Sequence, residues 1–343
     1  MKRTLSILGL AAATLLAAPL ARAHTTFNCN GSPMLWIGAQ PPFRISDISF
    51  PPGSTFDSRL LSMMSRWNGI GRSSFDFIVA RDTDGTVGAG NFQNEVFFKS
   101  IDGAGGTLGV TRMLFSPCLF SAAIIEADIF FDVAESWSTL SVPTEAQILA
   151  TINFPLVALH ELGHALGLDH ENDMLDTMNA FYGVGALGAG RVIAPHADCR
   201  NGARIIYPLS GSSIREYAIS NWKRTSSSGS SGLISTPTSA SRGSTITMQF
   251  TMENLGTTTN SPVVGHFLST NTTISTSDIR IGTTSGISMS RGTVRTRTAT
   301  VTIPSTVAPG VYFLGSIVDV NNTLVETDET NNALAAPRTI TIN

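Results

Sequence analysis

The chain has 343 residues, which is long enough for two domains of ordinary size, each with its own core. Its formal net charge is −3 and charged residues make up only 14% of it, so nucleic acid is excluded as an expected partner. Uncharged polar residues replace charged ones, a composition more typical of extracellular proteins than of cytosolic ones.

The first residues have the three parts of a secretory signal. Lys2 and Arg3 precede an apolar run at residues 5–20, and Ala21-Arg22-Ala23 supplies a cleavage site. A membrane anchor needs ~20 apolar residues without a helix breaker, whereas this run is shorter and contains Pro19. We therefore expect a signal peptide at residues 1–23 and a secreted chain, extracellular or periplasmic, with no membrane span after cleavage. Loss of three basic residues takes their count from 22 to 19 against 25 acids, a net charge of −6.

Strand and helix patterns are mixed in the next part of the chain. Strands are predicted at residues 43–48, 75–80 and 124–131, and helices at residues 56–67 and in two stretches within 142–167. The last helix can begin at Asn153, a capping residue, with Pro155 in its first turn. Gly167 is a natural place for it to end. This mixture favours an α+β domain at residues 24–210.

The last predicted helix carries the pattern H-E-x-x-H-x-x-G-x-x-H. His160 and His164 are four residues apart, so on a helix their imidazoles project from one face and can share a metal ion. His170 reaches the same ion only if the chain bends, which Gly167 permits. These histidines are the predicted ligands of one zinc ion.

Zinc with three protein ligands keeps an open position for water and polarises a peptide carbonyl. Glu161 follows the first ligand and can take a proton from the water and return it to the leaving amine. H-E-x-x-H alone also arises by chance on amphipathic helices, with both histidines at the surface. The glycine and the third histidine at fixed offsets favour a catalytic zinc site and hydrolysis of peptide bonds.

Three cysteines, Cys29, Cys118 and Cys199, lie outside this pattern and have no C-x-x-C spacing. In an oxidising compartment two of them can pair and leave one over, and the sequence does not indicate which two. A thiolate can also ligate zinc, so a block of the active site by Cys29 is an alternative to a disulfide or a buried thiol.

A change of composition divides the chain. Residues 225–232 read T-S-S-S-G-S-S-G, without one apolar side chain, which predicts a flexible linker at residues 211–232. Beyond it, runs rich in β-forming residues, clearest in the alternation at 245–254, predict strands at residues 245–254, 263–268, 294–303, 311–320 and 339–342. We expect an all-β immunoglobulin-like sandwich at residues 233–343.

The histidine pattern resembles that of the metzincin metallopeptidases, which implies a zincin-like catalytic domain with a mixed twisted sheet and an active-site helix. Met178, eight residues after His170, is spaced like the methionine turn of the matrixins, the matrix metalloproteinase branch. The resemblance implies that Met178 lies beneath the zinc. Met174 is the competing candidate, and core packing is the commoner role of a methionine.

Two further segments resemble the calcium site of matrixins: D-G-A-G-G-T-L at residues 102–108 and D-V-A-E-S-W at residues 132–137. Calcium takes six to eight oxygen ligands. The resemblance implies carboxylate ligands from Asp102, Asp132 and Glu135 and carbonyl ligands from Gly103, Gly105 and Thr107. The alternative is a glycine-rich hairpin with solvated acids.

The same resemblance implies a place for substrate. Leu108, Gly109 and Val110 would run beside the substrate, which adds to them as a strand. Tyr182 belongs to a loop, from Asn179 to about Asp198, that would form a wall of the pocket.

The chain also departs from the matrixin pattern. Val110 and Phe130 stand where matrixins carry histidines of a structural zinc, so a second zinc is not expected. Glu171 is more typical of the astacin branch, yet Ala180 stands where an astacin has a tyrosine ligand.

The C-terminal part resembles the bacterial β-sandwich modules called CARDB. The likeness is in E-N-L-G at residues 253–256, P-G-V-Y at 309–312, V-D-V-N at 318–321 and E-T-N-N at 329–332. It implies attachment to a cell surface or an extracellular polymer. Asp319, Asp328 and Glu329 could bind a cation, and solvated turn acids are the favoured alternative.

The sequence therefore predicts a secreted zinc-dependent endopeptidase that acts on extracellular proteins or peptides with Glu161 as general base. The alternative is an adhesion or binding protein in which the C-terminal module functions and the peptidase domain is a scaffold. Retention of Glu161 beside its three histidines argues for the enzyme, because a scaffold has no use for that carboxylate.

Overall fold

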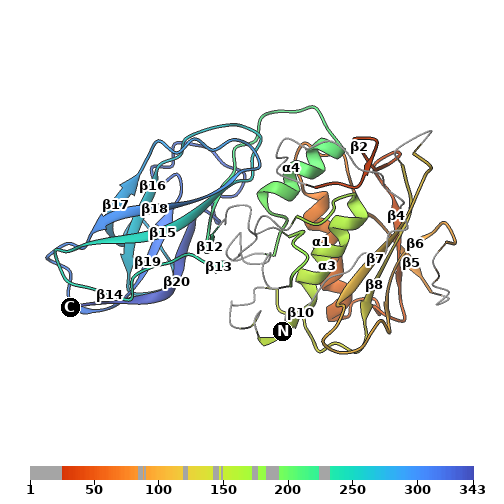
Figure 1. Cartoon of the computed structure of the whole chain (residues 1–343), viewed down its shortest axis with the longest axis horizontal. Helices are drawn as coiled ribbons and strands as arrows, with labels where there is room; N and C mark the ends of the chain where they lie inside the picture. Colours follow the sequence, from red (N-terminus) through yellow and green to blue (C-terminus); the bar gives the residue numbers. More distant parts are fainter. Residues whose placement is uncertain are drawn as a thin grey trace.

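The computed structural model describes residues 25–343 except 84–87, 89, 119–122, 142–146, 148–149, 172–176, 183–192 and 224–231. The expected signal peptide, most of the helical stretch before Asn153, and most of the Ser/Gly-rich run lie outside the described residues. Figure 1 shows the rest as a mixed body of helices and strands followed by a body of strands alone. The predicted fold class, α+β followed by an all-β sandwich, is confirmed.

A twisted six-stranded sheet forms one layer of the first body (Figure 1). Its strands are β3 (Leu35–Trp36), β8 (Ala123–Asp132), β6 (Asn94–Lys99), β4 (Pro42–Ser46) and β5 (Ile78–Asp82) in spatial order, with β7 (Gly109–Phe115) also paired to β8. Only β7 runs antiparallel to its neighbour; the other pairs are parallel. The strands predicted at 43–48 and 124–131 are confirmed by β4 and β8, and the one predicted at 75–80 is β5, displaced toward its C-terminus.

Two helices pack together on one face of this sheet: α1 (Thr55–Asn68) and α3 (Phe154–Leu166) (Figure 1). The buried indole of Trp67 on α1 donates to the carbonyl of Leu159 on α3, 3.0 Å away, which joins the two helices. Phe154, at the start of α3, contacts the rings of Phe50 and Phe131. Each such buried aromatic stabilises the fold by about 1.5–3 kcal/mol, so α3 is anchored in the core at its N-terminal end.

The ends of α3 follow the predicted signals. The Asn153 side chain accepts from the backbone N–H of Leu156 at 3.2 Å, and Pro155 lies in the first turn, where its missing N–H costs nothing. Gly167 has φ +119°, a conformation that other residues rarely adopt. The helix therefore ends at Leu166, two residues after His164, and the chain turns back.

Small two-stranded sheets and a disulfide complete this body. β1 (Asn28–Cys29) pairs with β2 (Ser32–Pro33), and β9 (Trp137–Ser138) pairs with β10 (Ile152–Asn153). Cys29 is bonded to Cys118, and Cys199 is a buried free thiol. A disulfide-bonded Cys29 has no thiolate that could bind zinc, so the predicted alternative, a block of the active site by Cys29, is wrong.

The second body is a sandwich of two sheets (Figure 1). One has the order β11 (Tyr217–Ser220), β15 (Thr245–Asn254), β18 (Val294–Thr302). The other has the order β14 (Ser239–Ala240), β20 (Ala333–Ile342), β19 (Gly310–Ile317), β16 (Val264–Ser269), β17 (Ile279–Thr284). Strands β12 (Trp222–Lys223) and β13 (Gly232–Leu233) pair with each other in a separate two-stranded sheet. All five predicted strands are present, and β11, β12, β13, β14 and β17 are additional strands.

Strand β11 lies inside residues 211–232, which we expected to be a linker. Its residues Tyr217 to Ser220 are all buried and pair with β15. That part of the linker prediction is wrong, because four residues with alternating apolar side chains complete the edge of the sheet. The Ser/Gly-rich run therefore falls between two strands of the sandwich.

A helix that the sequence did not suggest, α4 (Ala197–Ile206), lies between the two bodies (Figure 1). Two arginines and an asparagine interrupt its apolar positions. Among the described residues no helix is long and apolar enough to cross a membrane.

Candidate metal centre

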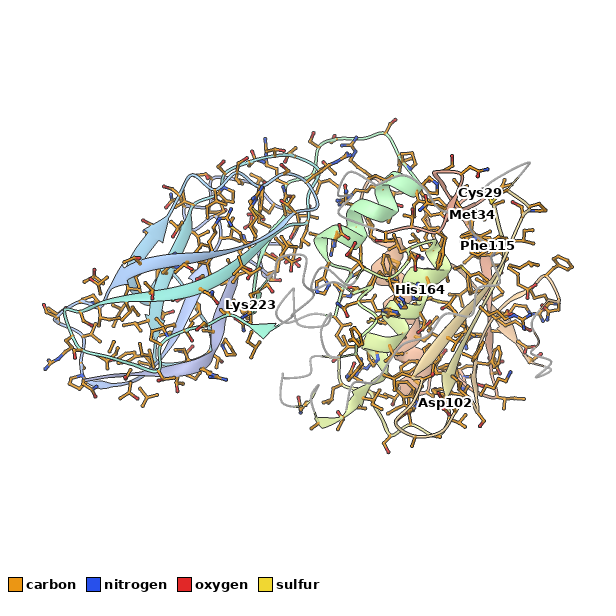
Figure 2. The ribbon with its side chains drawn as sticks, in the orientation of Figure 1. Cys29, Met34, Asp102, Phe115, His164 and Lys223 are labelled. Atoms are coloured by element: carbon orange, nitrogen blue, oxygen red, sulfur yellow. A yellow bond between two sulfur atoms is a disulfide. The ribbon has the colours of Figure 1, made fainter. Side chains whose placement is uncertain are left out.

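Three histidines converge where α3 ends. His160 and His164 lie one turn apart on α3, and His170 follows the turn at Gly167. Ligand atoms of the three rings all lie within 4.8 Å of one another, and Nε2 of His164 is 3.3 Å from Nε2 of His170. Figure 2 shows His164 in the middle of the first body. The structure thus brings together the three predicted ligands.

Backbone carbonyls decide which nitrogen carries the proton on two of these rings. Nδ1 of His160 is 2.7 Å from the carbonyl oxygen of Thr177, and Nδ1 of His164 is 2.8 Å from that of Leu168. A carbonyl can only accept, so each Nδ1 donates and each Nε2 keeps a lone pair. Nε2 of His160 is buried and has no hydrogen-bond partner among the described residues. Buried lone pairs that face one another call for a cation, and three imidazoles fit zinc.

Burial keeps these imidazoles neutral. Both His160 and His164 are 1% exposed. Burial, helped by the nearby His170, lowers the pKa of His160 to about 3, and burial also lowers the pKa of His164 and of His170. The neutral ring is the form that binds metal, so the cluster needs no deprotonation at ordinary pH.

Glu161 lies beside the cluster and is held by one side chain. The Thr111 hydroxyl is 2.7 Å from Oε2 of Glu161 and 2.9 Å from its backbone carbonyl oxygen. The other carboxylate oxygen, Oε1, is buried and has no hydrogen-bond partner among the described residues. Burial raises the pKa of Glu161 to about 8, and the hydrogen bond from Thr111 opposes that rise. One oxygen is therefore fixed and the other is left for a reacting group.

Strand β7 approaches this carboxylate closely because it carries a glycine there. A Cβ on Gly109 would lie 3.0 Å from both Cγ and Oε1 of Glu161. Gly109 and Thr111 are two apart on β7, so both face α3. The sequence did not single out Thr111, although the period of a strand places it on the same face as Gly109.

Met178 lies against the underside of α3. It is 2% exposed, and a Cβ on Gly163 would collide with its sulfur and come within 3.0 Å of the Trp67 ring. Its neighbour Thr177 supplies the carbonyl that orients His160. The role of Met178 as the turn beneath the zinc stays a prediction, and the competing Met174 lies outside the described residues.

The two predicted calcium segments do meet. Gly103 N–H donates to Oδ2 of Asp132 at 3.0 Å, and Gly105 N–H donates to Oε1 of Glu135 at 2.6 Å. Burial alone would raise the pKa of Asp132, but hydrogen bonds from backbone N–H groups lower it below its usual value. Asp102 accepts from both the N–H and the hydroxyl of Thr107. Asp102 lies at the lower edge of the first body in Figure 2, well below His164.

N–H and O–H donors thus orient these three carboxylates within the loop. Calcium binding at this place stays a prediction, and the carbonyls of Gly103, Gly105 and Thr107 as its ligands stay predictions as well.

The predicted substrate residues lie in different settings. Leu108 is fully buried in the core, and its carbonyl accepts from Asp132 N–H at 3.0 Å. Val110 is buried and pairs with Phe130 between β7 and β8. The side chains of valine and phenylalanine carry no nitrogen that could bind a metal. The Tyr182 hydroxyl donates to the Thr151 carbonyl at 2.9 Å. The hydroxyl also accepts from the N–H of Asn153, so Tyr182 ties the beginning of its loop to the start of α3. Residues 183–192 of that loop, the predicted wall of the pocket, lie outside the described residues.

A second residue that the sequence did not single out is His196. It precedes α4, is 1% exposed, and its Nδ1 is 3.1 Å from the Thr177 hydroxyl. It is one contact removed from the predicted ligand His160, through Thr177.

Comparison with known proteins agrees with this geometry. A family model described as matrixin matches residues 49–207, and one described as CARDB matches residues 232–336. The chain is 31% identical over 152 residues to matrilysin of Felis catus, covering 43% of this chain and 52% of that protein. It is 26% identical over 144 residues to metalloendoproteinase 1 of Glycine max, covering 42% of each. The chain thus spans about half the length, or less, of these curated relatives.

Among solved structures, the chain is similar to the crystal structure of a CARDB domain from Pyrococcus furiosus in complex with di-metal ions. The identity is 16% and the TM-score 0.27, with 39% of this chain and 97% of that one covered. The histidine cluster on α3 lies within the matrixin match, and the sandwich lies largely within the CARDB match. Residues 49–207 are therefore a matrixin domain, and residues 232–336 are a CARDB domain.

Proposed function

We propose that this chain is a zinc-dependent endopeptidase. The proposal rests on one observation. Backbone carbonyls accept from Nδ1 of His160 and of His164, so the Nε2 lone pair of each ring is left to face the cluster, and the buried Oε1 of Glu161 lies beside it. His160, His164 and His170 would hold the zinc ion. Bound zinc would lower the pKa of a water molecule toward ~7 and polarise the peptide carbonyl under attack.

The chain's own residues supply the proton transfers and the positioning. Oε1 of Glu161 accepts a proton from the attacking water and passes it to the nitrogen of the leaving amine. Thr111 keeps Oε2 in place, so that the carboxylate need not reorganise during the reaction. Gly109 lets β7 approach, and β7 pairs only with β8 among the described strands. An extended peptide can add to its other edge through backbone hydrogen bonds.

The proposal also covers where the chain acts and what it cleaves. A disulfide between Cys29 and Cys118 is typical of an oxidising compartment, which supports a secreted protein, extracellular or periplasmic, with its signal peptide at residues 1–23. The substrates are proteins or peptides met there. Calcium at the loop of Asp102, Asp132 and Glu135 would replace backbone donors with an ion that binds the same carboxylates. The CARDB domain would attach the enzyme to a cell surface or an extracellular polymer.

Hydrolysis of unfolded casein by the zinc-loaded full chain tests the activity. We expect cleavage that a chelator abolishes, and Glu161→Ala should remove activity while zinc stays near one ion per chain. Arg338→Ala, a substitution of an exposed charged residue of β20, is the control and should cleave like wild type. A chain that binds zinc and cleaves no protein or peptide would contradict the proposal and favour the scaffold alternative.

A further inference from the structure

Helix α4 is held from both sides, by the matrixin domain and by the CARDB domain. Arg204 bridges them: its Nε donates to the Gly71 carbonyl at 2.9 Å and its Nη1 to the Gly256 carbonyl at 3.3 Å. Arg204 is only 9% exposed and donates to carbonyls of both domains. Burying a guanidinium without such acceptors is costly, so these hydrogen bonds hold the two domains against α4.

Other contacts across this boundary are close, and some of them are apolar. Ala197 packs in one buried apolar cluster with three residues of the sandwich: Ala218, Leu255 and Val294. A Cβ on Gly292 of the sandwich would lie 2.8 Å from Cβ of Asn201, which shows how near the backbones come. This docking also accounts for β15: in its N-terminal half buried and accessible residues alternate, but residues 251–254 are buried on both faces.

The sandwich also contributes charge at the start of α4. The side chain of His196, the residue before the helix, makes no capping hydrogen bond to it. Instead Oε2 of Glu253, on β15, accepts from the Ala197 N–H at 3.5 Å. A carboxylate at a helix N-terminus is stabilising because it faces the positive end of the helix dipole. Glu253 is 1% exposed, so solvent screens this interaction little.

The start of α4 in turn contacts Thr177, the residue that orients His160. His196 Nδ1 is 3.1 Å from the Thr177 hydroxyl, and the backbone N–H of His196 donates to the same oxygen at 3.4 Å. The carbonyl of Thr177 accepts from Nδ1 of His160. The connection from Glu253 to His160 therefore runs through α4, His196 and Thr177, without a gap.

We propose that the CARDB domain supports the zinc site: Glu253 and Arg204 hold α4, and His196 at its start is a positioning residue that keeps Thr177 against His160. This role rests on the proposed zinc site, and it differs from attachment to a polymer, since it is exerted within the chain. Groups that orient a metal-ligating histidine set its tautomer and ring direction, and their loss typically weakens metal binding about 10- to 100-fold.

The test measures zinc release from the full chain to a coloured chelator. We expect His196→Ala to speed release about 10-fold, while His196→Asn, whose amide can meet the Thr177 hydroxyl, should stay near wild type. Glu253→Gln should speed release about 2- to 5-fold, the effect of one helix-terminal charge. Arg204→Gln is a second variant of the joint, and Arg297→Gln, at an exposed arginine of β18, is the control.

Coupling separates support from simple destabilisation. If Glu253 acts through His196, Glu253→Gln should add nothing to release in the His196→Ala background. Additive effects, or wild-type release in both Glu253→Gln and Arg204→Gln, would overturn the inference. Zinc release is read without substrate, so a chain that holds zinc but cleaves nothing contradicts the proposed peptidase and leaves this test intact. A wild-type chain that binds no zinc would overturn both.

Discussion

Replacing Thr111 with valine removes a single oxygen from the neighbourhood of Glu161 and keeps the shape of the side chain. The hydroxyl lies 2.7 Å from Oε2 in a fully buried position, so no solvent can take its place. A hydrogen bond to a charged group contributes about 1.5–3 kcal/mol. The one hydroxyl proton is shared with the backbone carbonyl of Glu161 at 2.9 Å, which favours the lower half of that range.

A loss of about 1.5–2 kcal/mol corresponds to a fall of roughly 10- to 30-fold in kcat/KM, since each 1.36 kcal/mol is tenfold in rate. The fall should be in kcat with KM unchanged, because Thr111 acts on the general base and not on the substrate. The assay is steady-state cleavage of a fluorogenic peptide, with zinc content measured for each variant. Thr111→Ser should recover most of the activity, and Thr298→Val, an exposed threonine of β18, is the control.

The reasoning would be refuted by a Thr111→Val chain with full zinc content and a kcat/KM within twofold of wild type. Thr111 would then merely satisfy the carbonyl of α3. Equal losses in Thr111→Val and Thr111→Ser would point to packing and not to the hydrogen bond.

Three further predictions concern stability. Burial lowers the folded-state pKa of His266 from 6.5 to about 4, so below pH 6.5 only the unfolded chain takes up this proton; stability should fall by about 3 kcal/mol between pH 6.5 and 4. Urea unfolding at pH 7 and 4.5 measures this loss in the free energy of unfolding. If His266→Gln lost as much stability over that range as wild type does, another group would be responsible. Gly163→Ala should lower the free energy of unfolding by about 1–3 kcal/mol through overpacking against Met178, seen as a lower melting temperature. A wild-type melting temperature would mean that the Met178 side chain moves aside. Removing the bond between Cys29 and Cys118, which are 89 residues apart, by substituting both with serine should cost about 2–4 kcal/mol in denaturant unfolding, and an unchanged midpoint would argue against the pairing.

Local patterns in the sequence were sufficient for several elements. His160 and His164 share a face because they are four apart on a helix, and Asn153, Pro155 and Gly167 mark where that helix begins and ends. Each of these signals is set by residues within a turn or two, so no knowledge of distant segments is needed. The strands β4, β8 and β15 were predicted for the same reason.

The resemblance to matrixins predicted contacts between distant segments that hydrophobic periodicity could not. Asp102 and Asp132 were expected together because two short motifs occur in family order, and the structure brings both segments to one loop. The hydrogen bonds there also show that the carboxylates are satisfied by backbone donors, which no motif could indicate.

The sequence by itself was enough to predict a cluster of His160, His164 and His170 with Glu161 beside it, and to divide the chain into a mixed domain and a sandwich, since these depend on spacing and composition. The tertiary structure alone decided that Thr111 holds Glu161, 50 residues away, that Cys29 pairs with Cys118, that residues 217–220 belong to the sandwich, and that Glu253 caps α4. Contacts of this kind depend on how distant segments are placed against one another, and hydrophobic periodicity carries no information about which polar side chains then meet.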